Sequence, residues 1–221
     1  MNEFNEFSVN YTDDMINCVP HYLKLLSSFN EDLPEDFTPQ YILDFGCGNG
    51  NVTSTLLQLF PKSNFVLLDA SQQMINLCRT RFEAYGVEYI TSYFKDYRFK
   101  EDHFDLITAG FSLHHCDSEE KKILFRKINK SLKKGGIFGY SDLMVNKNKP
   151  EHLKLLNEWS TFVHKSFPDG EKWEWIMEHY DKFDRPDGYN DQIKWLKQAG
   201  FKNIRLTTKE SYWVHLRAIK E

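Results

Sequence analysis

The sequence predicts an α/β fold with a mostly parallel sheet, and two stretches carry this prediction. The first is an apolar run at 41–45 that breaks into alternate glycines and then continues with helical spacing over 51–60. This pattern predicts a buried strand, a tight turn and a helix. The second is the apolar run 65–69, which ends in Asp69, 19 residues after Gly50. One helix fits between the two runs, and an acid at the end of such a second strand typically accepts hydrogen bonds from ribose hydroxyls.

The turn has chemistry suited to a nucleotide-like ligand. Glycine permits a positive φ and close approach of a ligand, and free N–H groups at the start of the next helix favour an anionic group. The spacing is G-x-G-x-G, at Gly46, Gly48 and Gly50. The dinucleotide fingerprint G-x-G-x-x-G would need glycine in place of Asn51, and no Gly-Lys-Ser/Thr follows to make a phosphate loop.

The helices and strands before the first strand and after the second one are predicted from helix-capping residues and from prolines and glycines that end a helix or strand. Asp13 or Asp14 could cap an N-terminal helix, which we expect to kink or break at Pro20. The further strands that the pattern predicts are 87–93, 104–110 and 137–143, then an antiparallel pair, 201–208 and 211–219. It also predicts three further helices. The first spans 72–85 and is capped by Ser71. The second is capped by Ser118, has Lys133 and Lys134 in its last turn and stops at Gly135-Gly136, and the last one ends at Gly200.

Length and composition limit the class of protein. At 221 residues with 41% apolar content, the chain suits one α/β domain that carries an insertion. Its four cysteines are widely spaced, and its N-terminus lacks the layout of a signal peptide, so we expect reduced thiols in the cytoplasm. No apolar run approaches the roughly 20 residues of a membrane span. The net charge of −4 and the dispersed basic residues disfavour a nucleic acid partner.

Several segments together resemble one enzyme family. L-D-F-G-C-G-N-G at 43–50 resembles motif I of the class I S-adenosylmethionine (SAM) dependent methyltransferases, and Asp-Ala-Ser-x-x-Met at 69–74 also looks like the family pattern. The segment 104–115, ending Phe-Ser-Leu-His-His, is similar to the family's fourth strand and its continuation, and 195–201 is similar to its final helix. The resemblance implies a Rossmann-like fold with a seven-stranded, mostly parallel sheet, an antiparallel last strand and a helical cap.

The resemblance also implies which residues bind SAM, the cofactor, which methyl transfer converts to S-adenosylhomocysteine. The glycine turn would lie under the methionine part of SAM, and Asp44 would help to hold its amino end. Asp69 would accept hydrogen bonds from the ribose, while Ala70 and Met74 would border the ribose and adenine; ordinary core packing is the alternative for Met74. The predicted cofactor-binding residues are Asp44, Gly46, Cys47, Gly48, Gly50, Asp69, Ala70, Met74, Tyr93, Phe94, Asp96, Phe111 and Tyr22.

The adenine position departs from the family pattern. An Asp just beyond the third strand commonly accepts the hydrogen bond of the adenine amino group, and that position falls near Tyr93, with Asp96 three residues later. Two interpretations stay open. Asp96 reads the adenine from a shifted loop, or Tyr93 and Phe94 flank the ring while a backbone group reads its edge.

His114 and His115 are the candidate catalytic residues. They follow the fourth strand at the sheet edge where open α/β sheets bind ligands, and an imidazole can act as a general base near neutral pH. The alternative is that one histidine packs against the cofactor or a loop carbonyl and the other is solvated. We predict no metal site, because the ligand types from His114 to Asp117 are consecutive and cannot readily point at one ion.

The acceptor is expected to be a small molecule. The Pro-Cys dipeptide of cytosine C5 methylation and the Asn/Asp-Pro-Pro-Tyr/Phe motif for exocyclic amino groups of bases are both missing. The segment 145–190 is rich in aromatics, among them Trp159, Trp173 and Trp175. They could form a cage for a cationic amine through cation–π contacts, or the hydrophobic underside of a helical lid.

Two alternatives to methyl transfer stay open. Residues 14–22 are similar to the N-terminal segment of the carboxy-SAM synthases, in which the tyrosine, here Tyr22, lies close to the ligand. Those enzymes carboxylate the methyl group of SAM using prephenate. Their fourth-strand continuation differs from this one, and their carboxylate-gripping arginine has no secure counterpart here, Arg185 being the nearest. The other alternative is a SAM-binding module without catalysis.

We expect one SAM-dependent methyltransferase domain, 1–221, that acts as a monomer or a homodimer. Its expected parts are an N-terminal helical arm or lid (1–39), a SAM-binding core (40–144), a helical substrate cap (145–190) and a C-terminal helix with a β-hairpin (191–221).

Overall fold

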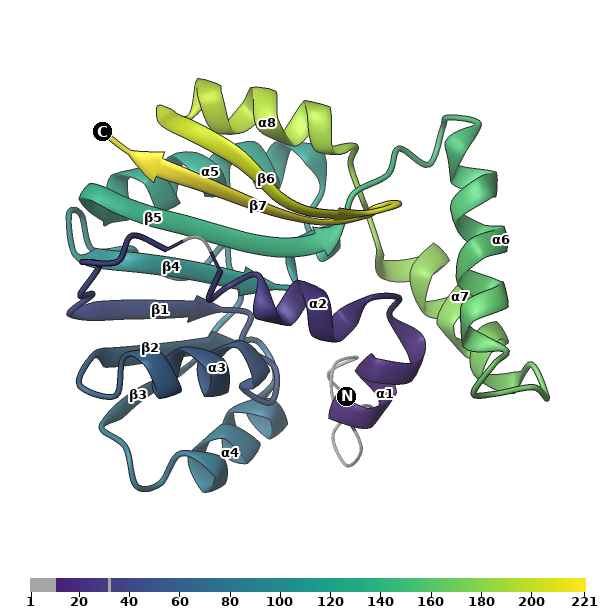
Figure 1. Ribbon diagram of the computed structural model, residues 1–221, viewed down its shortest axis with the longest axis horizontal. Coiled ribbons are helices and arrows are strands. Elements are labelled where there is room, and N and C mark those ends of the chain that lie inside the picture. Colours follow the sequence, from purple (N-terminus) through teal and green to yellow (C-terminus); the bar gives the residue numbers. More distant parts are fainter. Residues whose placement is uncertain (1–10, 32) are drawn as a thin grey trace.

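A seven-stranded sheet forms the centre of the protein, as Figure 1 shows for the computed structural model, which describes residues 11–31 and 33–221. The strand order is β3-β2-β1-β4-β5-β7-β6; β7 runs antiparallel to both neighbours, and the other pairs are parallel. The strands are β1 (Tyr41–Phe45), β2 (Asn64–Asp69), β3 (Val87–Thr91), β4 (Phe104–Gly110), β5 (Leu132–Leu143), β6 (Phe201–Glu210) and β7 (Trp213–Lys220). The predicted α/β fold, with its antiparallel last strand, is confirmed.

Helices cover both faces of this sheet. Alternate residues of a strand point to opposite faces, so Ile42 packs in one apolar cluster with Leu56 of α3, while Leu43 packs in another with Phe125 of α5. The helices are α1 (Tyr11–Cys18), α2 (Tyr22–Ser27), α3 (Asn51–Leu59), α4 (Gln72–Arg81), the short 3-10 helix η2 (Leu113–His115), α5 (Ser118–Ser131), α6 (Glu151–Val163), α7 (Glu171–Phe183) and α8 (Tyr189–Gln198). None of the described helices is long and apolar enough to span a membrane.

The N-terminal helix breaks at Pro20, as predicted. Pro20 separates α1 from α2, and His21 takes a left-handed φ of 60°. The predicted cap at Asp13 or Asp14 is wrong, because α1 already begins at Tyr11 and both acids lie in its first turn, where they favour the positive end of the helix dipole. The first ten residues of the expected arm lie outside the described part of the chain.

Helix α5 differs from the prediction at both ends. Its N-cap is Asp117, which accepts from the backbone N–H of Glu120 while the Glu120 side chain accepts from Asp117 N, a capping box that Ser118 does not make. The helix ends at Ser131, so the predicted stop at Gly135-Gly136 is wrong, and the basic residue of the last turn is Lys130 and not Lys133 or Lys134. Leu132 instead pairs with Phe104 and begins β5. The chain joins the sheet before it reaches the glycines, so pairing with β4 ends the helix first.

Two helices inserted after β5 pack with α1 over one end of the sheet (Figure 1). Trp159 of α6 meets Trp173, Tyr180 and Trp213 at ring-centroid distances of 5.6, 5.6 and 5.3 Å, all edge to face. Its indole N–H donates to Cys18 O at 2.6 Å. We call α1, α6 and α7 the helical cap. The aromatic contacts fit the hydrophobic underside of a lid better than a cage for a cation.

Candidate functional site

A cavity of about 440 Å³ lies between the carboxyl ends of the strands and the helical cap. One wall is the glycine turn, Asp69 and the start of α4, and the opposite wall is apolar, with Trp159, Trp175 and Trp213. Open α/β sheets bind their ligands at this edge. The cavity therefore joins the two regions that the sequence predicts to hold a cofactor and a substrate.

The glycine turn has no room for side chains at two of its three glycines, Gly46 and Gly50. Gly46, Gly48 and Gly50 have φ of +77°, +53° and +85°. A Cβ on Gly46 would lie 2.5 Å from the Cβ of Ser112, and one on Gly50 would lie 2.4 Å from the Phe82 ring. The glycines thus keep the turn close to the neighbouring segments and leave its cavity side open to a ligand.

Asp69 closes the turn from the end of β2. Its carboxylate accepts from Gly48 N at 2.9 Å and from Ser71 N at 2.8 Å. Burial raises the pKa of Asp69, although these backbone donors oppose the shift. Ser71 caps α4 as predicted, accepting from Met74 N at 3.3 Å, which places Met74 in the cavity wall.

The predicted cofactor residues divide into two sets. Those that line the cavity are Gly46, Gly48, Asp69, Ala70, Met74, Tyr93, Phe94 and Phe111. Those that are not among its lining residues are Tyr22, Asp44, Cys47, Gly50 and Asp96. The direct ligand contacts of the second set stay predictions, and three of its members have other partners in the fold.

Asp44 lies fully buried behind the turn. Its Oδ2 accepts from Thr53 Oγ1 at 2.6 Å and Thr53 N at 3.2 Å, and Thr108 Oγ1 donates to its Oδ1 at 3.3 Å. Burial raises the pKa of Asp44 to about 6. Tyr22 is also behind the turn, where its hydroxyl accepts from Asn51 Nδ2 at 2.8 Å.

The residues of the two open interpretations of the adenine site have different surroundings. Tyr93 and Phe94 line the cavity, and Phe94 stacks on Phe45 with a centroid distance of 4.0 Å. Asp96 is exposed and lies in a turn, where its N–H donates to Tyr93 O. Which group reads the adenine stays a prediction.

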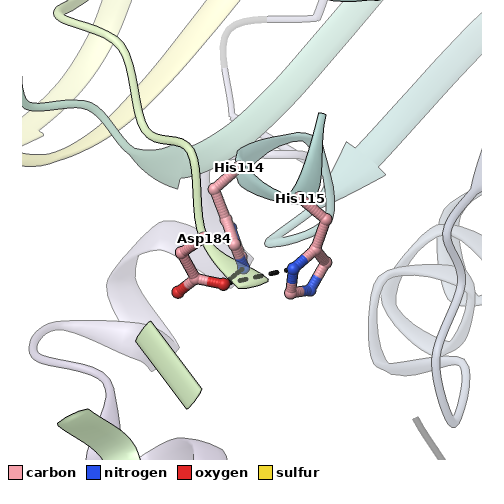
Figure 2. A group of neighbouring side chains, drawn as sticks. All are labelled: His114, His115 and Asp184. Carbon is pink, nitrogen blue, oxygen red and sulfur yellow. Dashed lines mark ion pairs between the residues drawn. The ribbon is translucent and has the colours of Figure 1, made fainter. Parts of the chain in front are cut away.

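His114 and His115 lie in the cavity wall within a larger group, which we call the histidine–aspartate group: His114, His115, Asp142, His179 and Asp184. His114 Nδ1 is 2.5 Å from Asp142 Oδ1, and its backbone N–H donates to Asp142 Oδ2 at 2.9 Å. Asp184 Oδ1 is 3.2 Å from His115 Nδ1 and 3.8 Å from His114 Nε2, as Figure 2 shows. His179 Nε2 is 3.7 Å from the same oxygen.

The two adjacent histidines differ in charge. Burial alone would lower the pKa of His114, but the carboxylates of Asp142 and Asp184 together outweigh it and raise this pKa to about 9. Burial, followed by the charge of His114, lowers the pKa of His115. Near pH 7, therefore, His114 carries a proton on both nitrogens, and His115 is the neutral imidazole of the pair.

Comparisons with known proteins agree with this geometry. A model of the methyltransferase domain family matches residues 42–136. A carboxy-S-adenosyl-L-methionine synthase of Campylobacter fetus is 25% identical over 99% of this chain and 94% of its own, and a ubiquinone/menaquinone biosynthesis C-methyltransferase of Shewanella oneidensis is 27% identical over 75% and 68%. The crystal structure of human N-acetylserotonin methyltransferase in complex with SAM is similar in fold, with a TM-score of 0.60 at 15% identity over 91% of this chain and 52% of that one.

Residues 42–136 form a SAM-dependent methyltransferase domain. The chain is an enzyme that uses SAM, since the family model covers the glycine turn, Asp69 and β4. The chemistry of these residues fits the cofactor: two glycines of the turn leave no space for a Cβ, the Asp69 carboxylate can accept from hydroxyl groups, and two aromatic rings line the cavity. We call the cavity-lining residues Gly46, Gly48, Asp69, Ala70 and Met74 the cofactor cradle.

Sequence reasoning missed three of the five members of the histidine–aspartate group of this methyltransferase. Asp142 is the last but one residue of β5, His179 lies on α7, and Asp184 is the C-cap of that helix. Of these three, only Asp142 could have been predicted from its position in the sequence. It lies near the carboxyl end of a central strand, next to the strand that precedes His114. His179 and Asp184 reach the site through the packing of the cap, which has no local pattern.

Proposed function

We propose that this methyltransferase moves a methyl group from SAM to a small-molecule acceptor held beneath the helical cap. The observation that carries the proposal is the continuous cavity, in which the cofactor cradle faces apolar cap residues such as Trp175 and Ile176. A largely apolar cavity with a few polar groups suits a small organic molecule. The wall of this cavity also holds His114 and His115, beside the path between cofactor and cap.

The residues then have distinct parts in the transfer. When bound, SAM supplies a methyl group already activated by the sulfonium charge and leaves as S-adenosylhomocysteine. The cradle fixes the donor, and the cap excludes water and orients the acceptor for in-line attack. Where the acceptor carries a proton, His115 accepts it, because this imidazole is neutral near pH 7 and Asp184 Oδ1, 3.2 Å away, stabilises the imidazolium that forms.

A deuterium-labelled methyl group tests this proposal. The chain is incubated with methyl-deuterated SAM and a panel of small aromatic and aliphatic acceptors, and the products are analysed by mass spectrometry. We expect one acceptor class to gain an intact trideuteromethyl group with one equivalent of S-adenosylhomocysteine. Tight SAM binding without S-adenosylhomocysteine formation on any acceptor would contradict methyl transfer.

The carboxy-SAM reaction is the second candidate, because three relatives of that name match 96–99% of the chain. One observation speaks against it. The Arg185 guanidinium donates to the backbone carbonyls of Lys182 and Asp184, and no arginine is among the described residues that line the cavity. In the same assay, prephenate replaces the acceptor panel. A SAM derivative heavier by one carboxylate, formed only with prephenate, would favour this second function.

A further inference from the structure

Three imidazole nitrogens surround one buried carboxylate oxygen at the cavity wall. His115 Nδ1, His179 Nε2 and His114 Nε2 lie 3.2, 3.7 and 3.8 Å from Asp184 Oδ1. The ligand atoms of His114, His115 and Asp184 all lie within 4.8 Å of one another. They come from η2, from α7 and from the cap of α7, so the tertiary fold brings them together.

Hydrogen bonding does not account for these contacts. The buried Asp184 Oδ1 accepts no hydrogen bond within the described part of the chain, although the His115 distance is short enough for one, and the distances from His114 and His179 are too long. An ion between them would account for the whole set. Nitrogen and oxygen ligands lie about 2.0–2.1 Å from Zn²⁺, so in a tetrahedron they lie roughly 3.4 Å from each other. The observed separations are close to this value before any ion has drawn the side chains in.

Asp142 completes the arrangement from behind. It holds the Nδ1 side of His114 at 2.5 Å, which turns Nε2 toward Asp184. Histidine ligands of metals usually have such a carboxylate on the other ring nitrogen. Asp142 and Asp184 are 2% and 5% exposed, and among the described residues no lysine or arginine forms an ion pair with either. The protonated His114 between them balances one of these two buried negative charges, and a divalent cation that replaces its Nε2 proton would balance both.

We propose that His114, His115, His179 and Asp184 bind a divalent transition metal ion of the zinc type, with Asp142 as the carboxylate that orients His114. The expectation of no metal site considered only consecutive residues. The structure replaces Cys116 and Asp117 of that set with Asp184, which lies within 4.8 Å of both histidines, and with His179, 3.7 Å from Asp184, and all four are ligand types that zinc accepts.

The site would also give the cap a chemical part in the reaction. All four ligand residues line the cavity, so an oxygen of the acceptor can enter as a fifth ligand. This part rests on the proposed function. With the ion bound, His115 is a ligand and no longer the base: the ion would lower the pKa of an acceptor hydroxyl, whose proton leaves to water while its oxygen attacks the methyl carbon. Metal binding itself depends neither on SAM nor on an acceptor.

Metal titration of the whole chain, freed of metal by a chelator, tests the site without any reaction. We expect calorimetry with Zn²⁺ to give one ion per chain, and Co²⁺ to show the strong visible absorption of a tetrahedral site. Asp184→Asn and His115→Gln should weaken binding by more than 100-fold, and Asp142→Asn by about 10- to 100-fold. Two nearby changes outside the group, Asp181→Asn and His152→Gln, serve as matched controls that should bind like the parent.

SAM affinity, measured on each variant, reports whether the fold is intact. If the Asp184→Asn variant still binds SAM but no longer binds Zn²⁺, the result supports the site. If that variant does not fold, the same comparison is made with His115→Gln. Binding of Zn²⁺ that is no tighter in the parent than in these variants would overturn the proposal. Because these titrations contain no acceptor, failure of the metal site leaves methyl transfer untouched, and failure of methyl transfer leaves the metal result standing.

Discussion

The cofactor cradle and the histidine–aspartate group lie in one cavity but are built in different ways. The cradle comes from residues 46–74, where one strand–turn–helix unit and the next strand place every member. The histidine–aspartate group comes from η2, β5, α7 and the segment after α7, spread over residues 114–184. The difference indicates that binding SAM depends on local backbone geometry, while the chemistry on the acceptor depends on how the cap packs.

The largest expected effect is on the cradle, at Gly46. Its φ of +77° and the 2.5 Å approach to Ser112 leave no room for a methyl group, so Gly46→Ala must move the turn. We expect a loss of about 3 kcal/mol in SAM binding, or roughly 100-fold in Kd, measured by calorimetry.

Two glycines are the controls for this change. Gly86→Ala meets nothing within 4 Å, and its φ is not positive, so it should bind SAM normally. Gly135 has a φ of +79° but open space around its Cα, away from the cavity. Gly135→Ala therefore tests backbone strain alone, without steric overlap. Equal SAM affinity in Gly46→Ala and Gly86→Ala would refute the local-geometry view of the cradle.

The next effect concerns the second region, where loss of His115 should affect turnover and not cofactor binding. Loss of a general base costs about 100-fold or more in rate, so we expect His115→Gln to lower kcat about 100-fold while the Kd for SAM stays unchanged. His152→Gln, whose ring contacts Tyr180 outside the cavity, should keep full turnover. An unchanged kcat and pH profile in His115→Gln would remove the imidazole from the chemistry.

A smaller effect on SAM binding is expected at Asp69, a cradle residue, and none at Asp96, which lies outside the cradle. Asp69→Asn removes the charge and one of the two oxygens that accept from Gly48 N and Ser71 N. The ribose hydroxyls would lose a charged acceptor, at a cost of about 1.5 kcal/mol, or roughly 10-fold in Kd for SAM. Asp96→Asn changes an exposed turn residue and should leave the Kd as it is. If Asp96→Asn weakens SAM binding as much as Asp69→Asn does, the shifted-loop interpretation of the adenine site is right.

The same contrast explains what could be predicted from the sequence. The strand, turn and second acid of the cradle are local patterns, so the position of Asp69 at the end of β2 follows from spacing alone. Burial of both sheet faces also made the strands 41–45 and 104–110 visible as apolar runs. The end of α5 was not predictable in this way, because pairing of Leu132 with Phe104 competes with helix propensity and is decided by the sheet.

The histidine–aspartate group lay further from prediction. His114 and His115 were found through resemblance, but their partners depend on long-range contacts that no periodicity encodes. Asp184, 5% exposed at the end of a helix rich in charged residues, looks in the sequence like one more solvated acid. Only the packing of α7 against η2 shows that it is buried among imidazoles.

The smallest expected effect on SAM binding concerns Asp44, a motif residue that the structure places behind the cradle. Its pKa of about 6 lies above the ordinary value of 3.8, so the folded chain holds this proton more tightly than the unfolded chain does. Stability from this group is therefore greatest below pH 4 and falls as the pH rises to about 6, beyond which the buried charge costs about 3 kcal/mol. Asp44→Asn should remove that cost, stabilising the protein by about 3 kcal/mol at pH 7.5 and by almost nothing at pH 4, as measured by urea unfolding.

The Asn side chain can keep the hydrogen bonds of Asp44. Its carbonyl oxygen can accept from Thr53, and its amide can donate to the hydroxyl of Thr108, so the turn should hold its shape. We accordingly expect less than about a threefold change in the Kd for SAM, under 1 kcal/mol. A loss as large as that of Asp69→Asn would instead mean that the Asp44 charge acts on the amino end of SAM, and that the cradle extends one layer deeper than its lining residues.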